Sequence, residues 1–202
     1  MRVAAYALRE VTRWPLMTPY PVIVRDTLAV LRRGELAGQP GKKGRPDPVL
    51  VVDAGGAAGV IDLFKERGLT RTGLEAGNGA PGSSRGGPAL VPVLITTGFN
   101  ARWDKGRQLV PKAELVSAVG VALETNRLRW PEQGLPLLPT LVEELQQFRL
   151  RRSAATGTES WAAREGAHDD IVLALAIALW WGNHLRRDVM GEYKVALIHV
   201  YA

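Results

Sequence analysis

The run from Ile171 to Trp181 constrains this chain most, because it is apolar on every side. A helix without a polar face must be surrounded by other layers of the protein. Two acidic residues, Asp169 and Asp170, stand directly before the run. Carboxylates at the edge of a core need a hydrogen-bond partner, an ion pair or a metal. The simpler interpretation is that one Asp caps the helix and the other favours its dipole; a metal site is the alternative.

A third carboxylate, Asp53, favours the metal site because it ends a predicted strand. The preceding segment, Val49–Val52, is short, largely β-branched and bounded by Pro48 and by glycines, which is typical of a buried parallel strand. Ligand sites of open α/β sheets form at the carboxyl ends of the strands. The glycine-rich turn after Asp53 lacks both the Gly-Lys-Ser/Thr ending of a phosphate loop and the GxGxxG spacing, so we do not expect it to bind a nucleotide.

Composition narrows the class of protein. The length of 202 residues fits one domain, and a net charge of +6 favours a polyanionic partner such as nucleic acid. The absence of cysteine excludes disulfides, zinc-thiolate sites and a cysteine nucleophile, and the three histidines lack metal-ligand spacing. The sequence shows neither a signal-peptide pattern nor an apolar run of about 20 residues, so we expect a soluble protein without a membrane segment.

Strand and helix patterns alternate along the chain, which predicts an α/β fold with a largely parallel sheet. Strands are expected at 2–8, 49–53, 91–95, 128–130 and 159–163. Helices are expected at 22–33, 60–67, 111–126, 137–150 and from 168 onward. Residues 34–48 are interpreted as a linker, 70–88 as a flexible glycine-rich insertion, 101–110 as a basic loop and 186–202 as a variable tail, all within a single domain spanning 1–202.

Seven short motifs follow one another along these elements: TRWPLMTPY at 12–20, LVVDAGGAAG at 50–59, VPVLITTG at 91–98, VPKAELV at 110–116, NRLRWP at 126–131, EELQQF at 143–148 and GAHDDIVLAL at 166–175. In order and spacing they resemble the C-terminal nuclease domain of the large terminase subunit of tailed bacteriophages. The resemblance implies a ribonuclease H-like fold, a mixed, mostly parallel sheet flanked by helices. It also implies a DNA endonuclease that cuts concatemeric viral DNA during packaging.

The resemblance assigns both catalysis and metal binding to Asp53, Asp169 and Asp170. Two Mg²⁺ or Mn²⁺ ions in a complete site would clamp the attacking water and the leaving oxygen, and such ions prefer carboxylate ligands. His168 is expected to orient the leaving group or, more simply, to be a structural histidine at a helix start. The partners that the resemblance implies are double-stranded DNA, the terminase ATPase domain, the small terminase subunit and the portal, in the cytoplasm of an infected or lysogenic bacterium.

The sequence departs from the family in two respects. It has no counterpart of the acidic cluster on the family's first strand, and it lacks the ATPase domain with its phosphate loop. The resemblance therefore implies an N-terminally truncated nuclease whose activity alone is impaired. Two alternatives remain: a relic of the fold that binds DNA or an assembly partner, and another ribonuclease H-like enzyme of the resolvase or transposase type.

Basic residues supply the candidate DNA contacts. Arg102, Lys105 and Arg107 lie in the basic segment, and Lys112 follows at the start of a predicted helix. Contacts of this kind bind phosphates without reading sequence and weaken with salt. A second cluster comprises Arg149, Arg151 and Arg152, and a solvated surface is the simpler interpretation of both groups. Trp180 and Trp181 are expected in the core rather than stacked on bases.

Overall fold

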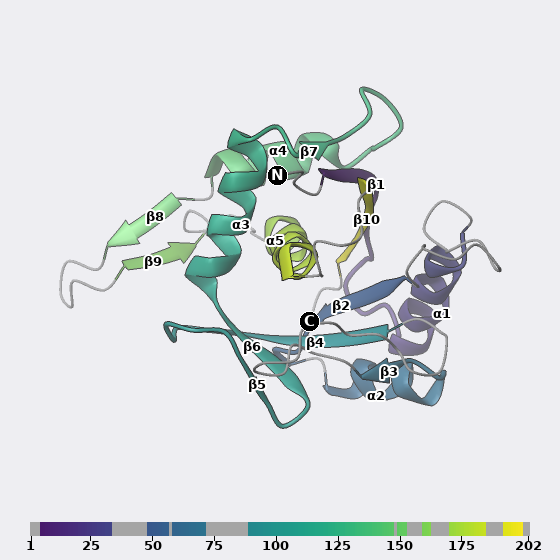
Figure 1. The fold of residues 1–202 in the computed structure, drawn as a ribbon. Coiled ribbons are helices and arrows are strands. Elements are labelled where there is room, and N and C mark those ends of the chain that lie inside the picture. Colours follow the sequence, from purple (N-terminus) through teal and green to yellow (C-terminus); the bar gives the residue numbers. More distant parts are fainter. Residues whose placement is uncertain are drawn as a thin grey trace.

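The computed structural model describes residues 5–33, 48–56, 58–71, 89–147, 149–152, 159–162, 170–184 and 192–199. These residues form an α/β fold in which helices flank sheets of mostly parallel strands (Figure 1). The predicted α/β class is thus confirmed. Within the described part of the chain, no helix is long and apolar enough to cross a membrane.

The larger sheet has the strand order β2-β4-β6-β5, and a short strand, β3, pairs with the start of β4. Strand β2 (Val49–Asp53) matches the prediction, and β4 (Ala89–Thr96) is longer at both ends than expected. Strand β3 (Thr70–Arg71) lies inside the predicted insertion, whose remaining residues, 72–88, are outside the described ones. All pairs in this sheet are parallel except that between β5 and β6.

The prediction of a loop at 101–110 is wrong, because the segment forms a hairpin of β5 (Arg102–Asp104) and β6 (Arg107–Pro111). The turn consists of Lys105 and Gly106, whose φ angles are 46° and 80°. Two consecutive positive φ angles match the twist of a two-residue hairpin. Lysine rarely adopts this conformation. The sequence of the turn is not the Asn-Gly or Asp-Gly that would have predicted a hairpin.

A second sheet joins distant parts of the chain in the order β10-β1-β7, with both pairs parallel. Strand β1 (Ala5–Arg13) extends well beyond the predicted end at residue 8, and β7 (Leu128–Arg129) lies where a strand was expected. Strand β10 (Glu192–His199) falls in the segment interpreted as a variable tail and pairs with β1 along its length.

The helices begin and end close to the expected positions. Helix α1 covers Tyr20–Leu31, α2 covers Ala58–Glu66, α3 covers Lys112–Glu124, α4 covers Leu138–Gln147 and α5 covers Asp170–His184. Pro111 is the residue that precedes α3 rather than part of its first turn. The predicted helix at 137–150 is too long, because Arg149–Arg152 forms β8, which pairs antiparallel with β9 (Glu159–Ala162).

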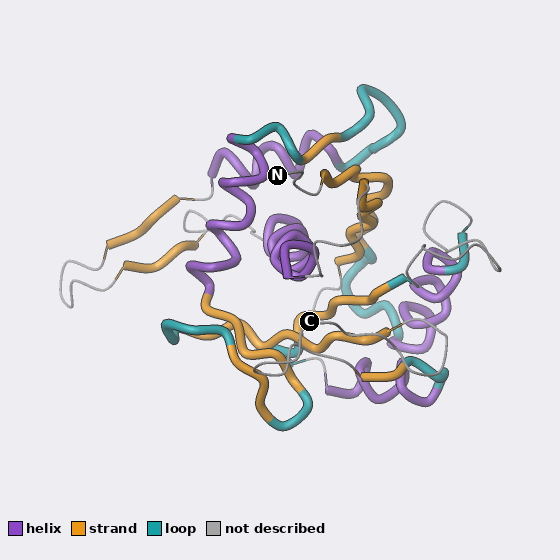
Figure 2. The backbone as a smooth tube through the Cα atoms, viewed as in Figure 1, coloured by secondary structure: helices purple, strands orange, loops and turns teal. Residues whose placement is uncertain are grey.

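Helix α5 occupies the centre of the fold, as its all-round apolar sequence predicts. Figures 1 and 2 show it almost end-on, with α3 on one side, β1 and β10 on the other, and the larger sheet beneath it. Ile171, Leu175 and Leu179 are fully buried, and they belong to one core cluster with Val91 and Val93 of β4. Trp180 and Trp181 lie in the same core, so their predicted placement is confirmed.

The opposite face of the larger sheet packs against α1 and α2 in a second, smaller core. Strand β2 shows the division clearly, because successive side chains of a strand point to opposite faces. Val49 and Val51 pack against the core that contains α5, whereas Leu50 and Val52 pack against the core of α1 and α2. Both faces of the sheet are therefore covered, which explains the continuous apolar sequence of β2.

Candidate functional site

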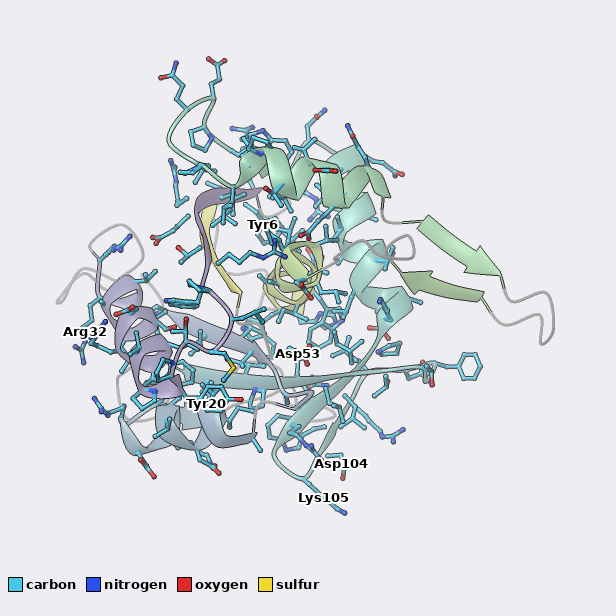
Figure 3. The ribbon with its side chains drawn as sticks, turned by 180° about the vertical axis from the view of Figure 1, so that it is seen from behind. Tyr6, Tyr20, Arg32, Asp53, Asp104 and Lys105 are labelled. Carbon is cyan, nitrogen blue, oxygen red and sulfur yellow. The ribbon has the colours of Figure 1, made fainter. Side chains whose placement is uncertain are left out.

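Asp53 ends β2 on the face of the sheet that α5 covers. It follows Val49 and Val51 at alternate positions, and both of these pack against the α5 core. Across the sheet Asp53 pairs with Val93 of β4, which pairs in turn with Gln108 of β6, so the three side chains form one row on this face. Figure 3 shows Asp53 between the sheet and α5. The sequence thus places a carboxylate at the carboxyl end of a parallel strand, as predicted.

The turn after β2 is built around the Asp53 carboxylate. Its Oδ1 accepts the backbone N–H of Gly55 at 2.8 Å, and a Cβ at Gly55 would lie 3.2 Å from the same oxygen. Gly56 follows with φ at 79°, a conformation that L residues rarely adopt. The two glycines therefore let the chain turn tightly beside the carboxylate. A side chain at position 55 would press on it.

Partial desolvation raises the pKa of the Asp53 carboxyl, and the hydrogen bond from Gly55 opposes this effect. The residue is nevertheless exposed to solvent. Surrounding protein atoms thus reduce the hydration of the carboxylate without closing it off. A carboxylate with reduced hydration is stabilised by a proton or by a nearby cation. Asp53 is therefore suited to act as a ligand of a metal cation.

The start of α1 contacts the first turn of α2, the helix that follows the Asp53 turn. A Cβ added at Gly59, in the first turn of α2, would lie 3.6 Å from the Tyr20 ring, at the start of α1. Figure 3 shows Tyr20 beside α1 and α2, whereas Asp53 lies between the sheet and α5. The TRWPLMTPY segment and the glycine-rich turn therefore form adjoining parts of one surface, although they are far apart in the sequence.

The start of α5 is held by a residue that sequence reasoning did not assign. Glu144 of α4 accepts the backbone N–H groups of Ile171 at 2.9 Å and Val172 at 3.1 Å. These N–H groups belong to the first turn of α5, where a helix has no internal acceptors. Burial raises the pKa of the Glu144 carboxyl, while the two N–H groups and the Arg13 charge oppose the rise. Glu144 thus accepts N–H groups of the kind that a capping side chain accepts, and Asp169, one of the two candidate caps, lies outside the described residues.

Arg13 links Glu144 to Asp170. Its Nη2 lies 3.3 Å from Asp170 Oδ2 and 3.5 Å from Glu144 Oε1. The three residues come from the end of β1, from α4 and from the start of α5, so the cluster joins three elements. Arg13 and Glu144 both lie inside motifs quoted above, TRWPLMTPY and EELQQF. Those motifs were the available signal, but nothing local in the sequence showed that the two residues meet.

The predicted metal ligands are only partly within the described residues. Asp53 and Asp170 are described, whereas Asp169 and His168 lie outside. Within the described ranges, no three acidic or histidine side chains are close enough together to hold one metal ion. The ligand set of Asp53, Asp169 and Asp170 therefore stays a prediction.

The predicted DNA contacts cluster on the β5–β6 hairpin. Arg102 pairs with Leu109, and Arg107 pairs with Asp104, so both arginines point to the face opposite Gln108 and Asp53. Lys105 lies at the hairpin tip, where Figure 3 shows it projecting away from the fold. Lys112 begins α3 directly after β6. The side chains of Arg149, Arg151 and Arg152 on β8 are outside the described ones.

Comparisons with family models, with curated proteins and with solved structures return no match for this chain. The resemblance to terminase nuclease domains rests on the sequence motifs.

Proposed function

We propose that this chain is a metal-dependent DNA endonuclease domain of the phage-terminase type, with a ribonuclease H-like fold. The observation that carries the proposal is the position of Asp53. It ends a parallel strand, on the face covered by α5, the helix that begins at Asp170. Nuclease motifs in the family's order surround both residues. Double-stranded DNA is the proposed substrate, and the net charge of +6 supports a polyanionic partner.

In this proposal Asp53, Asp169 and Asp170 hold Mg²⁺ or Mn²⁺, which prefer carboxylate oxygens. The bound ions would supply an activated water and charge stabilisation at the phosphate. The protein contributes position: Glu144 fixes the first turn of α5, and Arg13 orients the Asp170 carboxylate. The raised pKa of Asp53 supports its role, because a cation nearby would compensate the lost hydration.

A plasmid-nicking assay in Mn²⁺ tests the proposal. We expect slow, sequence-tolerant nicking by the chain, and its loss in Asp53→Asn and in Asp169→Asn. The matched control is Asp26→Asn, which removes an acid that pairs with Arg25 on the surface of α1. Calorimetric titration with Mn²⁺ gives an independent reading, since binding should weaken in the two site variants only. Nicking that survives Asp53→Asn would contradict the proposal.

A second candidate function is a DNA- or assembly-binding module without catalysis. The ion pair between Arg13 and Asp170 favours this second candidate, because a carboxylate paired with an arginine has less need of a metal ion. Extending the chain with an acidic first strand separates the two candidates. The nuclease proposal expects faster cleavage in the extended chain, whereas a binding module would bind DNA equally well in both forms and cut it in neither. Cutting confined to branched or transposon-end DNA would instead favour a resolvase or transposase.

A further inference from the structure

We propose that Phe99 is a base-stacking contact for unpaired nucleotides, presented by the loop that leads from β4 into the cationic β5–β6 hairpin. The inference rests on the proposed function, because it takes DNA as the partner. It adds a surface and a preference that the nuclease proposal does not contain: affinity for a strand whose bases are open to stacking. The hairpin, for this purpose, comprises Arg102–Pro111.

Phe99 is the most exposed large apolar side chain in the described part of the chain, at 95%. Removing an exposed phenyl ring from water is favourable, and its flat faces are well suited to stacking on another ring. The other side chain of comparable exposure is Met17, at 94%, in the loop between β1 and α1. Phe99 differs from Met17 in having a planar ring and in its cationic neighbours.

The loop that carries Phe99 is anchored on both sides. Strand β4 ends at Thr96, which pairs with Pro111 of β6. On the other side the Ala101 N–H bonds to Glu114 Oε1 at 3.1 Å, and Glu114 Oε2 accepts Trp180 Nε1 at 3.0 Å. Trp180 is 2% exposed, so this chain of contacts reaches the core. A ring presented from an anchored loop loses less conformational entropy on binding.

Charge complementarity selects nucleic acid over an apolar protein surface. Between residues 97 and 112 four cations accompany a single acid, Asp104; the cations are Arg102, Lys105, Arg107 and Lys112. Figure 3 shows the hairpin tip, with Asp104 and Lys105, projecting from the fold. An aromatic ring on a loop that continues into a cationic hairpin offers the combination that binds single strands, with phosphates on the cations and a base on the ring.

The position along β4 also suits a strand engaged at Asp53. Asp53 pairs with Val93, and Phe99 follows Val93 by six residues. Six residues span at most about 20 Å, which corresponds to about six nucleotide steps of a duplex strand at 3.4 Å each. The separation of Asp53 and Phe99 is therefore within the span of a short strand, whose phosphates could meet Arg102 and Arg107 only past the edge of the sheet, because these arginines lie on the face opposite Asp53.

Fluorescence anisotropy with single-stranded and duplex oligonucleotides, at several salt concentrations, tests the inference. Phe99→Ala should weaken single-strand binding roughly five- to hundredfold, while Phe99→Tyr should retain it. The slope of affinity against salt should stay unchanged, because no charge is removed. Val121→Ala, which truncates an exposed apolar side chain of α3, is the matched control and should leave binding unaltered. The fluorescent base analogue 2-aminopurine in the strand should report stacking in the wild type and lose that signal in Phe99→Ala.

The outcomes separate the inference from the proposed function. Unchanged single-strand binding and an unchanged stacking signal in Phe99→Ala overturn the inference, and the nuclease proposal stands if plasmid nicking persists. A wild-type chain that binds no DNA at low salt overturns both. If Phe99→Ala instead alters sedimentation while DNA binding is unaffected, Phe99 is a contact between proteins and the inference is wrong.

Discussion

Glu144 is the residue whose removal should most directly reveal how the site is held together. It is 6% exposed and accepts two N–H groups from the first turn of α5. In Glu144→Ala both N–H groups lose their acceptor in a buried place, and each such loss costs about 1–3 kcal/mol. Arg13 keeps Asp170 as a partner in this variant, so no cation is left without a counter-ion.

We expect Glu144→Ala to lower the free energy of unfolding by about 2–4 kcal/mol. The loss of the Arg13 contact adds to the cost of the two N–H groups, and water that reaches these groups reduces it. A loss of this size is a large part of the stability of an ordinary domain, about 5–15 kcal/mol. Urea denaturation followed by circular dichroism measures it. Glu144→Gln should cost much less, because the amide oxygen still accepts the N–H groups.

The neighbouring Glu143 supplies the control, since its side chain is exposed. Glu143→Ala should stay within about 0.5 kcal/mol of the wild type. If Glu144→Ala unfolds at the same denaturant concentration as Glu143→Ala, the hydrogen bonds to α5 contribute nothing measurable and the reasoning is refuted.

Three further predictions concern Asp53, the glycines and the hairpin. Because the pKa of Asp53 is raised in the folded state, its contribution to stability falls as pH rises above the unfolded pKa; thermal unfolding from acid to neutral pH should show this fall in the wild type and a smaller one in Asp53→Asn. Gly182→Ala should destabilise the fold by about 1–3 kcal/mol, because its Cβ would lie 2.5 Å from the Tyr6 ring, whereas Gly120→Ala meets nothing within 4 Å and should be neutral or stabilising by chemical denaturation. Replacing the hairpin group by Ala should weaken duplex binding and flatten its salt dependence, and an unchanged slope would place the DNA surface elsewhere; the group is Arg102, Lys105, Arg107 and Lys112.

Local pattern predicted the parts of the fold that local physics decides. The all-round apolar sequence of α5 required burial, and the β-branched run before Asp53 required a strand covered on both faces. The β5–β6 hairpin escaped because its turn is Lys105-Gly106 and its strands carry arginines. Neither residue of this turn, taken with its neighbours, distinguishes a hairpin from a loop in the sequence.

Partners distant in sequence could not be predicted in this way. The pairing of β10 with β1 depends on residues near opposite ends of the described chain, and no local signal encodes it. The same holds for the Arg13, Glu144 and Asp170 cluster, whose members come from three elements. Asp170 could be found in the sequence because it precedes a long apolar run, whereas the roles of Arg13, which contacts Asp170, and of Glu144, which holds the first turn of α5, could not.

The pairing of β1 with β10 has a consequence for synthesis of the protein on the ribosome. Strand β1 is made long before β10, so the edge that β10 covers stays open until Glu192–His199 has been translated. At 5–20 residues per second, the interval is on the order of ten to forty seconds. Helix α5, the centre of the core, also emerges late. The nascent chain therefore carries an open strand edge and uncovered apolar faces for most of its translation, and chaperones that shield such surfaces should govern its yield.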